Sequence, residues 1–138
     1  MKAIAWLLSA AILFAGALPV ANANTTKVIV LNITKGGLVT SDVPISHVKR
    51  IKLAKGTHVK LVFKFADKTH GAAHQFMLNS QGMEMTTPLL NTEAKEASIQ
   101  FTVGSKNETF YRLSCLVPCL AMDNLVDYVI LVDETKAA

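Results

Sequence analysis

The sequence predicts an all-β protein, a Greek-key β-sandwich of about seven strands. Short stretches rich in valine, isoleucine, leucine and phenylalanine recur along the chain, and segments containing glycine separate them at fairly regular spacing. No stretch shows the sustained 3.6-residue periodicity of a long amphipathic helix. Internal repeats and low-complexity linkers are absent from the sequence. We therefore expect one domain over residues 24–138, preceded by a leader over residues 1–23.

The leader has the three parts of a secretory signal peptide. Lys2 supplies the positive charge, an apolar run extends over residues 3–18, and Ala21-Asn-Ala23 has the small residues of a cleavage site. The apolar run is shorter than the roughly 20 residues that a membrane span needs. We expect cleavage after Ala23, a periplasmic or secreted mature protein and no stable membrane span, with an uncleaved amphipathic anchor as the less favoured alternative.

The first half of the chain is expected to hold four extended segments, at residues 27–34, 41–46, 47–53 and 58–65, with turns at 35–37 and 54–57. The segment 58–65 has the clearest strand pattern, since Lys60 and Lys64 face one way and four apolar residues face the other: Val59, Leu61, Phe63 and Phe65. Because Pro44 has no backbone N–H to donate, we expect the segment 41–46 at a sheet edge or in a loop.

The second half is expected to hold four further strands, at residues 74–78, 96–103, 109–114 and 125–132, with a loop at 66–73 and a turn at 104–108. Residues 79–94 are mixed in character and are interrupted by Pro88. For this segment we expect an irregular connection that holds one helical turn.

The charge of the chain limits which kinds of binding partner we expect. The chain carries 14 Lys+Arg against 10 Asp+Glu, and the basic residues are spaced as on the solvated faces of strands. This distribution argues against nucleic-acid binding and supports only a weak attraction to acidic partners. The sequence also lacks a recognisable catalytic serine, carboxylate pair or phosphate-binding loop, so we expect a protein that is not an enzyme.

The sulfur-bearing residues cluster near the end of the chain. Cys115 and Cys119, the only cysteines, are separated by three residues, and Met122 follows between the last two predicted strands. Soft sulfur ligands of this kind select copper, zinc or iron–sulfur centres. Exported cysteines normally pair, so a disulfide is the competing interpretation. A disulfide that closes a loop of only three intervening residues restricts the unfolded chain little, however, so stabilisation of the fold alone explains the spacing of the two cysteines poorly.

The order of these features resembles the cupredoxin family over essentially the whole of residues 24–138. The resemblance rests on the Lys55-Gly-Thr57 turn, on the strand that His74 opens, and on the strand Phe110–Cys115, which runs into a proline-containing loop with Met122. In cupredoxins a histidine at the start of a strand and the cysteine, histidine and methionine of the last loop bind one copper ion. The resemblance therefore implies that His74, Cys115 and Met122 are copper ligands.

The chain departs from the family pattern at the fourth ligand. Where the family places Gly-His after the loop proline, this chain has Cys119-Leu120. The two cysteines look more like the dinuclear copper centre of oxidase subunits and nitrous-oxide reductase, but the histidine that this centre needs is Asp123 here. The copper site is thus mononuclear or dinuclear, and His70 is a candidate to replace the missing imidazole.

Two functions remain open from the sequence. The first is an exported copper-binding protein, either an electron carrier or a Cu(I)-handling protein, with a redox or copper-delivery partner docking on a rim of Leu116, Val117 and Leu120. The second is a metal-free interaction or assembly module, in which Cys115 and Cys119 form a disulfide. In the second case His74 is an ordinary core or surface histidine and Met122 packs in the core. We expect the two remaining histidines, His47 and His58, on the surface. A second group of thioethers, Met77, Met83 and Met85, is a further candidate for binding Cu(I).

Overall fold

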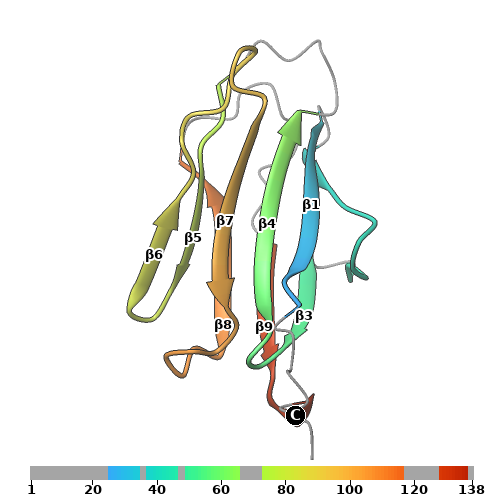
Figure 1. The fold of residues 1–138 in the computed structure, drawn as a ribbon, viewed down its shortest axis with the longest axis vertical. Helices are drawn as coiled ribbons and strands as arrows, with labels where there is room; N and C mark the ends of the chain where they lie inside the picture. The colour runs from blue at the N-terminus through green and yellow to red at the C-terminus, as the bar shows by residue number, and fades with distance from the viewer. Residues whose placement is uncertain (1–24, 35–36, 47–48, 66–72, 117–127, 137–138) are drawn as a thin grey trace, which may run out of the picture.

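The computed structural model describes residues 25–34, 37–46, 49–65, 73–116 and 128–136. Nine β-strands and one short 3₁₀ segment make up the regular structure of this part (Figure 1). The strands are β1 (Lys27–Thr34), β2 (Gly37–Val39), β3 (Arg50–Ala54), β4 (His58–Phe65), β5 (Phe76–Ser80), β6 (Met83–Thr86), β7 (Glu96–Thr102), β8 (Phe110–Cys115) and β9 (Tyr128–Asp133), followed by η1 (Glu134–Lys136). These residues include no α-helix, and hence none long and apolar enough to cross a membrane.

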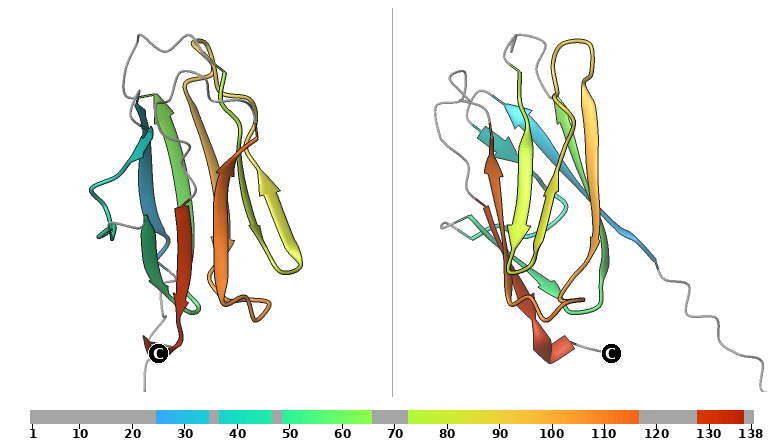
Figure 2. Two further views of the ribbon diagram at one scale, coloured as in Figure 1. Left: turned by 180° about the vertical axis from the view of Figure 1, so that it is seen from behind. Right: turned by 90° about the vertical axis from the view of Figure 1, so that its left-hand side faces the viewer.

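The strands form two sheets that pack face to face (Figures 1 and 2). The four-stranded sheet has the order β2-β1-β4-β7, and the five-stranded sheet has the order β3-β9-β8-β5-β6. Two neighbouring pairs run parallel, β1 with β4 and β3 with β9, and the other pairs are antiparallel. The predicted all-β sandwich is therefore confirmed, with two mixed sheets.

One apolar core fills the space between the sheets. In β1 every second residue from Ile29 onward is buried, because alternate side chains of a strand point to the same face. In β4 Val62 is buried as well as its neighbours Leu61 and Phe63. Phe63 of β4 stacks on Phe76 of β5, with ring centroids 4.6 Å apart, and so joins the two sheets. Burying one such side chain contributes about 1.5–3 kcal/mol, so the inner faces supply most of the stabilisation.

Hydrogen bonds from buried tyrosines connect elements that are distant in the sequence. The Tyr128 hydroxyl of β9 donates to the Leu38 carbonyl of β2 in the other sheet. At the turn after β7, the Gly104 amide donates to the Tyr111 hydroxyl at 2.7 Å. Gly104 has a φ of +68°, a conformation that a residue without Cβ adopts easily. These contacts fix β8 and β9, the strands on either side of the predicted ligand loop.

Several expected elements match the structure and others need correction. The strands predicted at 27–34 and 58–65 have these bounds in the structure, and the turn at 54–57 closes through a bond from the Thr57 amide to the Ala54 carbonyl. The expected count of about seven strands was low, because the short strands β2 and β6 were missed. The helical turn expected in 79–94 is wrong: β6 pairs with β5 there as a hairpin.

Candidate metal centre

The pairing of β5 with β8 brings His74 and Cys115 to the same end of the sandwich. Phe76 lies opposite Cys115 in the antiparallel register, and the Leu116 amide continues the ladder by donating to the Gln75 carbonyl at 2.8 Å. His74 precedes Phe76 by two residues, so its side chain lies on the same, inner face of the sheet. Diagonal neighbours of this kind are about 7–8 Å apart, a separation that allows two side chains to reach one metal ion.

His74 is held on all sides by the fold. Its backbone amide donates to the Leu90 carbonyl at 2.8 Å and its carbonyl accepts from the Leu90 amide at 2.7 Å. Its imidazole is fully buried, 5.4 Å from the Phe65 ring and 6.2 Å from the Phe76 ring, nearly parallel to the latter. Packing of this density leaves the ring little freedom to rotate, so the strands determine where its two nitrogens lie.

Sequence reasoning missed the segment that supports the histidine. The Phe76 amide donates a hydrogen bond to the side-chain oxygen of the buried Thr87 at 3.0 Å. The Gln75 side-chain amide donates to the Thr87 carbonyl. Residues Thr87 to Leu90 thus form an outer support for the strand that carries His74. The period-two pattern of Met83 and Met85, both partly buried against the core, was the available signal for a strand leading into this segment.

Cys115 ends β8, where it is half-buried and packs against the core. It is disulfide-bonded in the structure. The one other cysteine of the sequence is Cys119, which lies outside the described residues. A sulfur in a disulfide has no thiolate to offer, so Cys115 is a candidate metal ligand only in the reduced protein.

Three further predicted ligands, His70, Cys119 and Met122, lie outside the described residues, in the ranges 66–72 and 117–127. Both ranges are flanked by residues at the end of the sandwich that holds His74. Phe65 precedes the first range and contacts the His74 ring, and Leu116, bonded to Gln75, precedes the second. Within the part of the chain that the structure describes, no group of three histidine, cysteine or acidic residues is arranged to hold a metal ion.

The other histidine and methionine candidates among the described residues do not form part of this centre. His58 begins β4 at the end opposite Phe65, and its Nδ1 lies 2.8 Å from the Thr102 hydroxyl. His47 lies outside the described residues. Met83 and Met85 pack against the core, whereas Met77 lies on the other face of its sheet because it alternates with the buried Phe76 and Leu78. The three methionines therefore do not form one thioether cluster.

Comparison with known proteins rests on structure alone, since no family model and no curated protein matches this sequence. Auracyanin A, a "blue" copper protein from the green thermophilic photosynthetic bacterium Chloroflexus aurantiacus, matches with a TM-score of 0.54 and 15% identity, covering 79% of this chain and 100% of that chain. The fold is cupredoxin-like. Auracyanin B matches with a TM-score of 0.53 and 14% identity, covering 77% of this chain and 88% of that chain. At these identities the likeness to the auracyanins concerns the cupredoxin-like fold only.

Proposed function

We propose that the protein is an exported copper-binding protein that serves as an electron carrier or as a Cu(I)-handling protein. The observation that carries this proposal is the β5–β8 register, which brings an imidazole and a cysteine sulfur to one end of a cupredoxin-like sandwich. A nitrogen donor beside sulfur donors is a set that suits copper. The two described donors therefore fit the metal that the fold implies.

The proposed ligands are His74, Cys115, Cys119 and Met122, with His70 in place of the second imidazole. Bound copper would supply a one-electron redox centre, and an excess of sulfur donors would favour Cu(I). This set would serve a mononuclear or a dinuclear copper centre.

The chain's own residues prepare the centre in two ways. The rings of Phe65 and Phe76 enclose the His74 imidazole, exclude water and keep its nitrogens in place. The exposed Leu116 and Leu89, each about half accessible, lie beside Gln75 and Leu90 at the same end of the sandwich. They offer an apolar surface on which a redox or copper-delivery protein would dock.

The proposal includes the cellular context expected from the sequence. Residues 1–23 act as a signal peptide, and residues 24–138 form one domain in the periplasm or outside the cell. The protein carries out no enzymatic reaction of its own, binds no nucleic acid and has no stable membrane span.

A second candidate function is favoured by the disulfide at Cys115. In this alternative the sandwich is a metal-free interaction or assembly module, and Cys119 is the bonded partner. His74 is then a core residue whose ring fills the space between Phe65 and Phe76.

Copper titration of the reduced protein tests the proposal. We expect intense visible thiolate-to-copper absorption with Cu(II), or tight binding in a Cu(I) competition assay, and loss of either signal in Cys115→Ser. Met77→Leu is the matched control, because it removes a thioether from the outer face of the same sheet and leaves the candidate centre intact. Failure of the fully reduced protein to bind either ion would refute the copper proposal and leave the metal-free module.

A further inference from the structure

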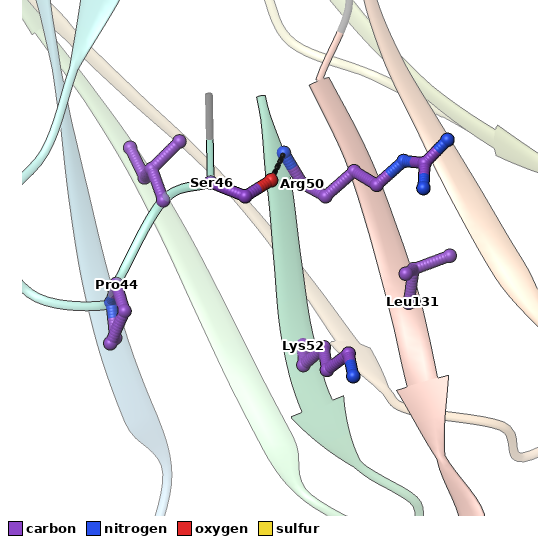
Figure 3. Close-up of a pocket in the computed structure, with 6 residues that line it drawn as sticks. Pro44, Ser46, Arg50, Lys52 and Leu131 are labelled. Carbon is purple, nitrogen blue, oxygen red and sulfur yellow. Dashed lines mark hydrogen bonds between the residues drawn. The ribbon is translucent and has the colours of Figure 1, made fainter. Parts of the chain in front are cut away.

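A groove runs along the outer edge of β3, on the flank of the five-stranded sheet (Figure 3). Its volume is about 640 Å³, within the range of sites that enclose part of a ligand. Figure 3 shows Pro44 on one side, with Arg50, Lys52 and Leu131 on the other. The full lining among the described residues is Pro44, Ile45, Ser46, Arg50, Lys52 and Leu131. The groove thus combines an apolar surface with two cations.

The backbone of β3 presents an open edge to this groove. The Val129 amide donates to the Lys49 carbonyl and the Lys55 amide donates to the Asp133 carbonyl, so the odd-numbered residues of β3 bond to β9. In a parallel pair the even-numbered residues then direct their amide and carbonyl groups to the other side. Arg50 shows this, since both of its backbone groups bond to Ser46.

Lys52 is the next even-numbered residue, so its backbone amide and carbonyl point away from β9, and among the described strands β3 has no second neighbour to pair with them. Beyond it, the Ala54 carbonyl accepts from the Thr57 amide in the turn. The unpaired stretch of the edge is therefore short and centred on Lys52. One amide and one carbonyl are available there for pairing with an incoming extended chain.

The charges around the open edge favour an acidic occupant. Arg50 and Lys52 are both exposed, and of the described residues that line the groove none is acidic. The ion pairs found among the described residues, Lys55–Glu134 and Lys64–Glu96, leave these two cations without a carboxylate partner there. A second copy of this chain is a poor occupant, because edge-to-edge pairing centred on Lys52 would oppose like charges.

We propose that the groove binds an extended acidic segment of a partner protein, which adds as a strand to the open edge of β3. The backbone of the segment pairs with the amide and carbonyl of Lys52, and its carboxylates approach Arg50 and Lys52. Its apolar side chains contact Leu131, Pro44 and Ile45. Main-chain pairing supplies affinity in this mode of recognition, and the side chains supply specificity. This inference is independent of copper binding.

The test uses the purified ¹⁵N-labelled protein and a blocked heptapeptide of alternating valine and glutamate. We expect the peptide to shift the amide resonances of Lys52 and its neighbours in β3 and β9. The same peptide N-methylated at alternate residues keeps its charge but cannot pair as a strand. It should bind about tenfold more weakly, because two hydrogen bonds are lost.

Charge reversal gives a second readout. Arg50→Glu with Lys52→Glu should weaken peptide binding at least about tenfold, as two attractive pairs become repulsive. Lys60→Glu with Lys95→Glu is the matched control, since it makes the same change in net charge, in β4 and just before β7 of the other sheet, and should leave binding within twofold.

Three results would overturn the proposal. The first is equal binding of the N-methylated and unmodified peptides, which would reduce the groove to a charged surface. The second is the absence of resonance shifts in β3. The third is the shifting of the same resonances by phosphatidylglycerol vesicles but not by the peptide, which would assign the groove to an anionic lipid surface.

Discussion

Glu108 offers a sharp test of how the fold fixes β8, the strand that ends in Cys115. The residue is buried, at 2% exposure, under the exposed residues Ser105 to Asn107 of the turn that precedes this strand. Its Oε2 accepts the Lys106 amide at 2.7 Å. Burial opposes ionisation, but hydrogen bonds from the amides of Lys106 and Glu108 and from Tyr111, with the charge of Lys106, hold the pKa of Glu108 below its usual range.

We predict that Glu108→Gln destabilises the protein by about 1–2 kcal/mol at pH 7. The variant keeps the shape of the side chain but replaces a charge-assisted hydrogen bond, which contributes about 1.5–3 kcal/mol, with a neutral bond of about 0.5–1.5 kcal/mol. We favour the lower end of the range because the three residues that precede Glu108 in the turn are exposed to solvent. Urea unfolding followed by circular dichroism measures the difference in free energy.

The pH dependence supplies the decisive comparison. Because the pKa of Glu108 is lower in the folded than in the unfolded protein, its contribution is fully present above the unfolded value of about 4.5. The contribution is lost as the pH falls through the folded pKa. The difference between wild type and Glu108→Gln should therefore shrink toward zero in strong acid. A difference that stays constant with pH would refute the reasoning, as would a change of similar size in the exposed control Glu96→Gln.

Three further predictions concern the turn, the histidine and the disulfide. Gly104→Ala should cost about 1–3 kcal/mol in thermal unfolding, because the added Cβ would lie 2.9 Å from Lys55 Cγ in a residue with φ of +68°; an unchanged melting temperature would contradict this. His74→Phe should keep the fold, as the new ring fills the space between Phe65 and Phe76, yet weaken copper binding in the reduced protein; retained affinity would exclude His74 as a ligand. If the disulfide at Cys115 closes the five-residue loop to Cys119, its reduction should lower the free energy of unfolding in urea by at most about 2 kcal/mol. Complete unfolding of the protein on reduction would contradict this.

The strength of the local pattern determined how much of the fold could be predicted. β1 and β4 are each eight residues long and rich in apolar residues, and their bounds were predicted correctly. β2 and β6 have three and four residues, too few to show a reliable period, and they are held by pairing with β1 and β5. Both pairings are tight hairpins, and the partner strand rather than the pattern of the short strand itself specifies them, which is why the segment 79–94 was misread as containing a helical turn.

The candidate centre shows the same limit. His74 and Cys115 could be selected from their residue types and from the order of features that resembles cupredoxins. Their placement on one inner face depends on the register of Phe76 with Cys115, 39 positions apart in the numbering, which no local pattern specifies. The assignments of His70, Cys119 and Met122 remain predictions.

The two proposed functions differ in the oxidation state of Cys115 and its disulfide partner and need no difference in fold. The core contacts that position His74, from Phe65, Phe76 and Leu90, do not involve Cys115. A disulfide that closes a short loop constrains the unfolded chain weakly, so its reduction leaves most of the folding free energy in the sandwich. The reduced protein would then present the Cys115 thiolate at the same end of the sandwich as a histidine that is already in place. Because thiolate ligands must be deprotonated and not joined in a disulfide, the redox state of Cys115 would decide whether its sulfur is available as a metal ligand.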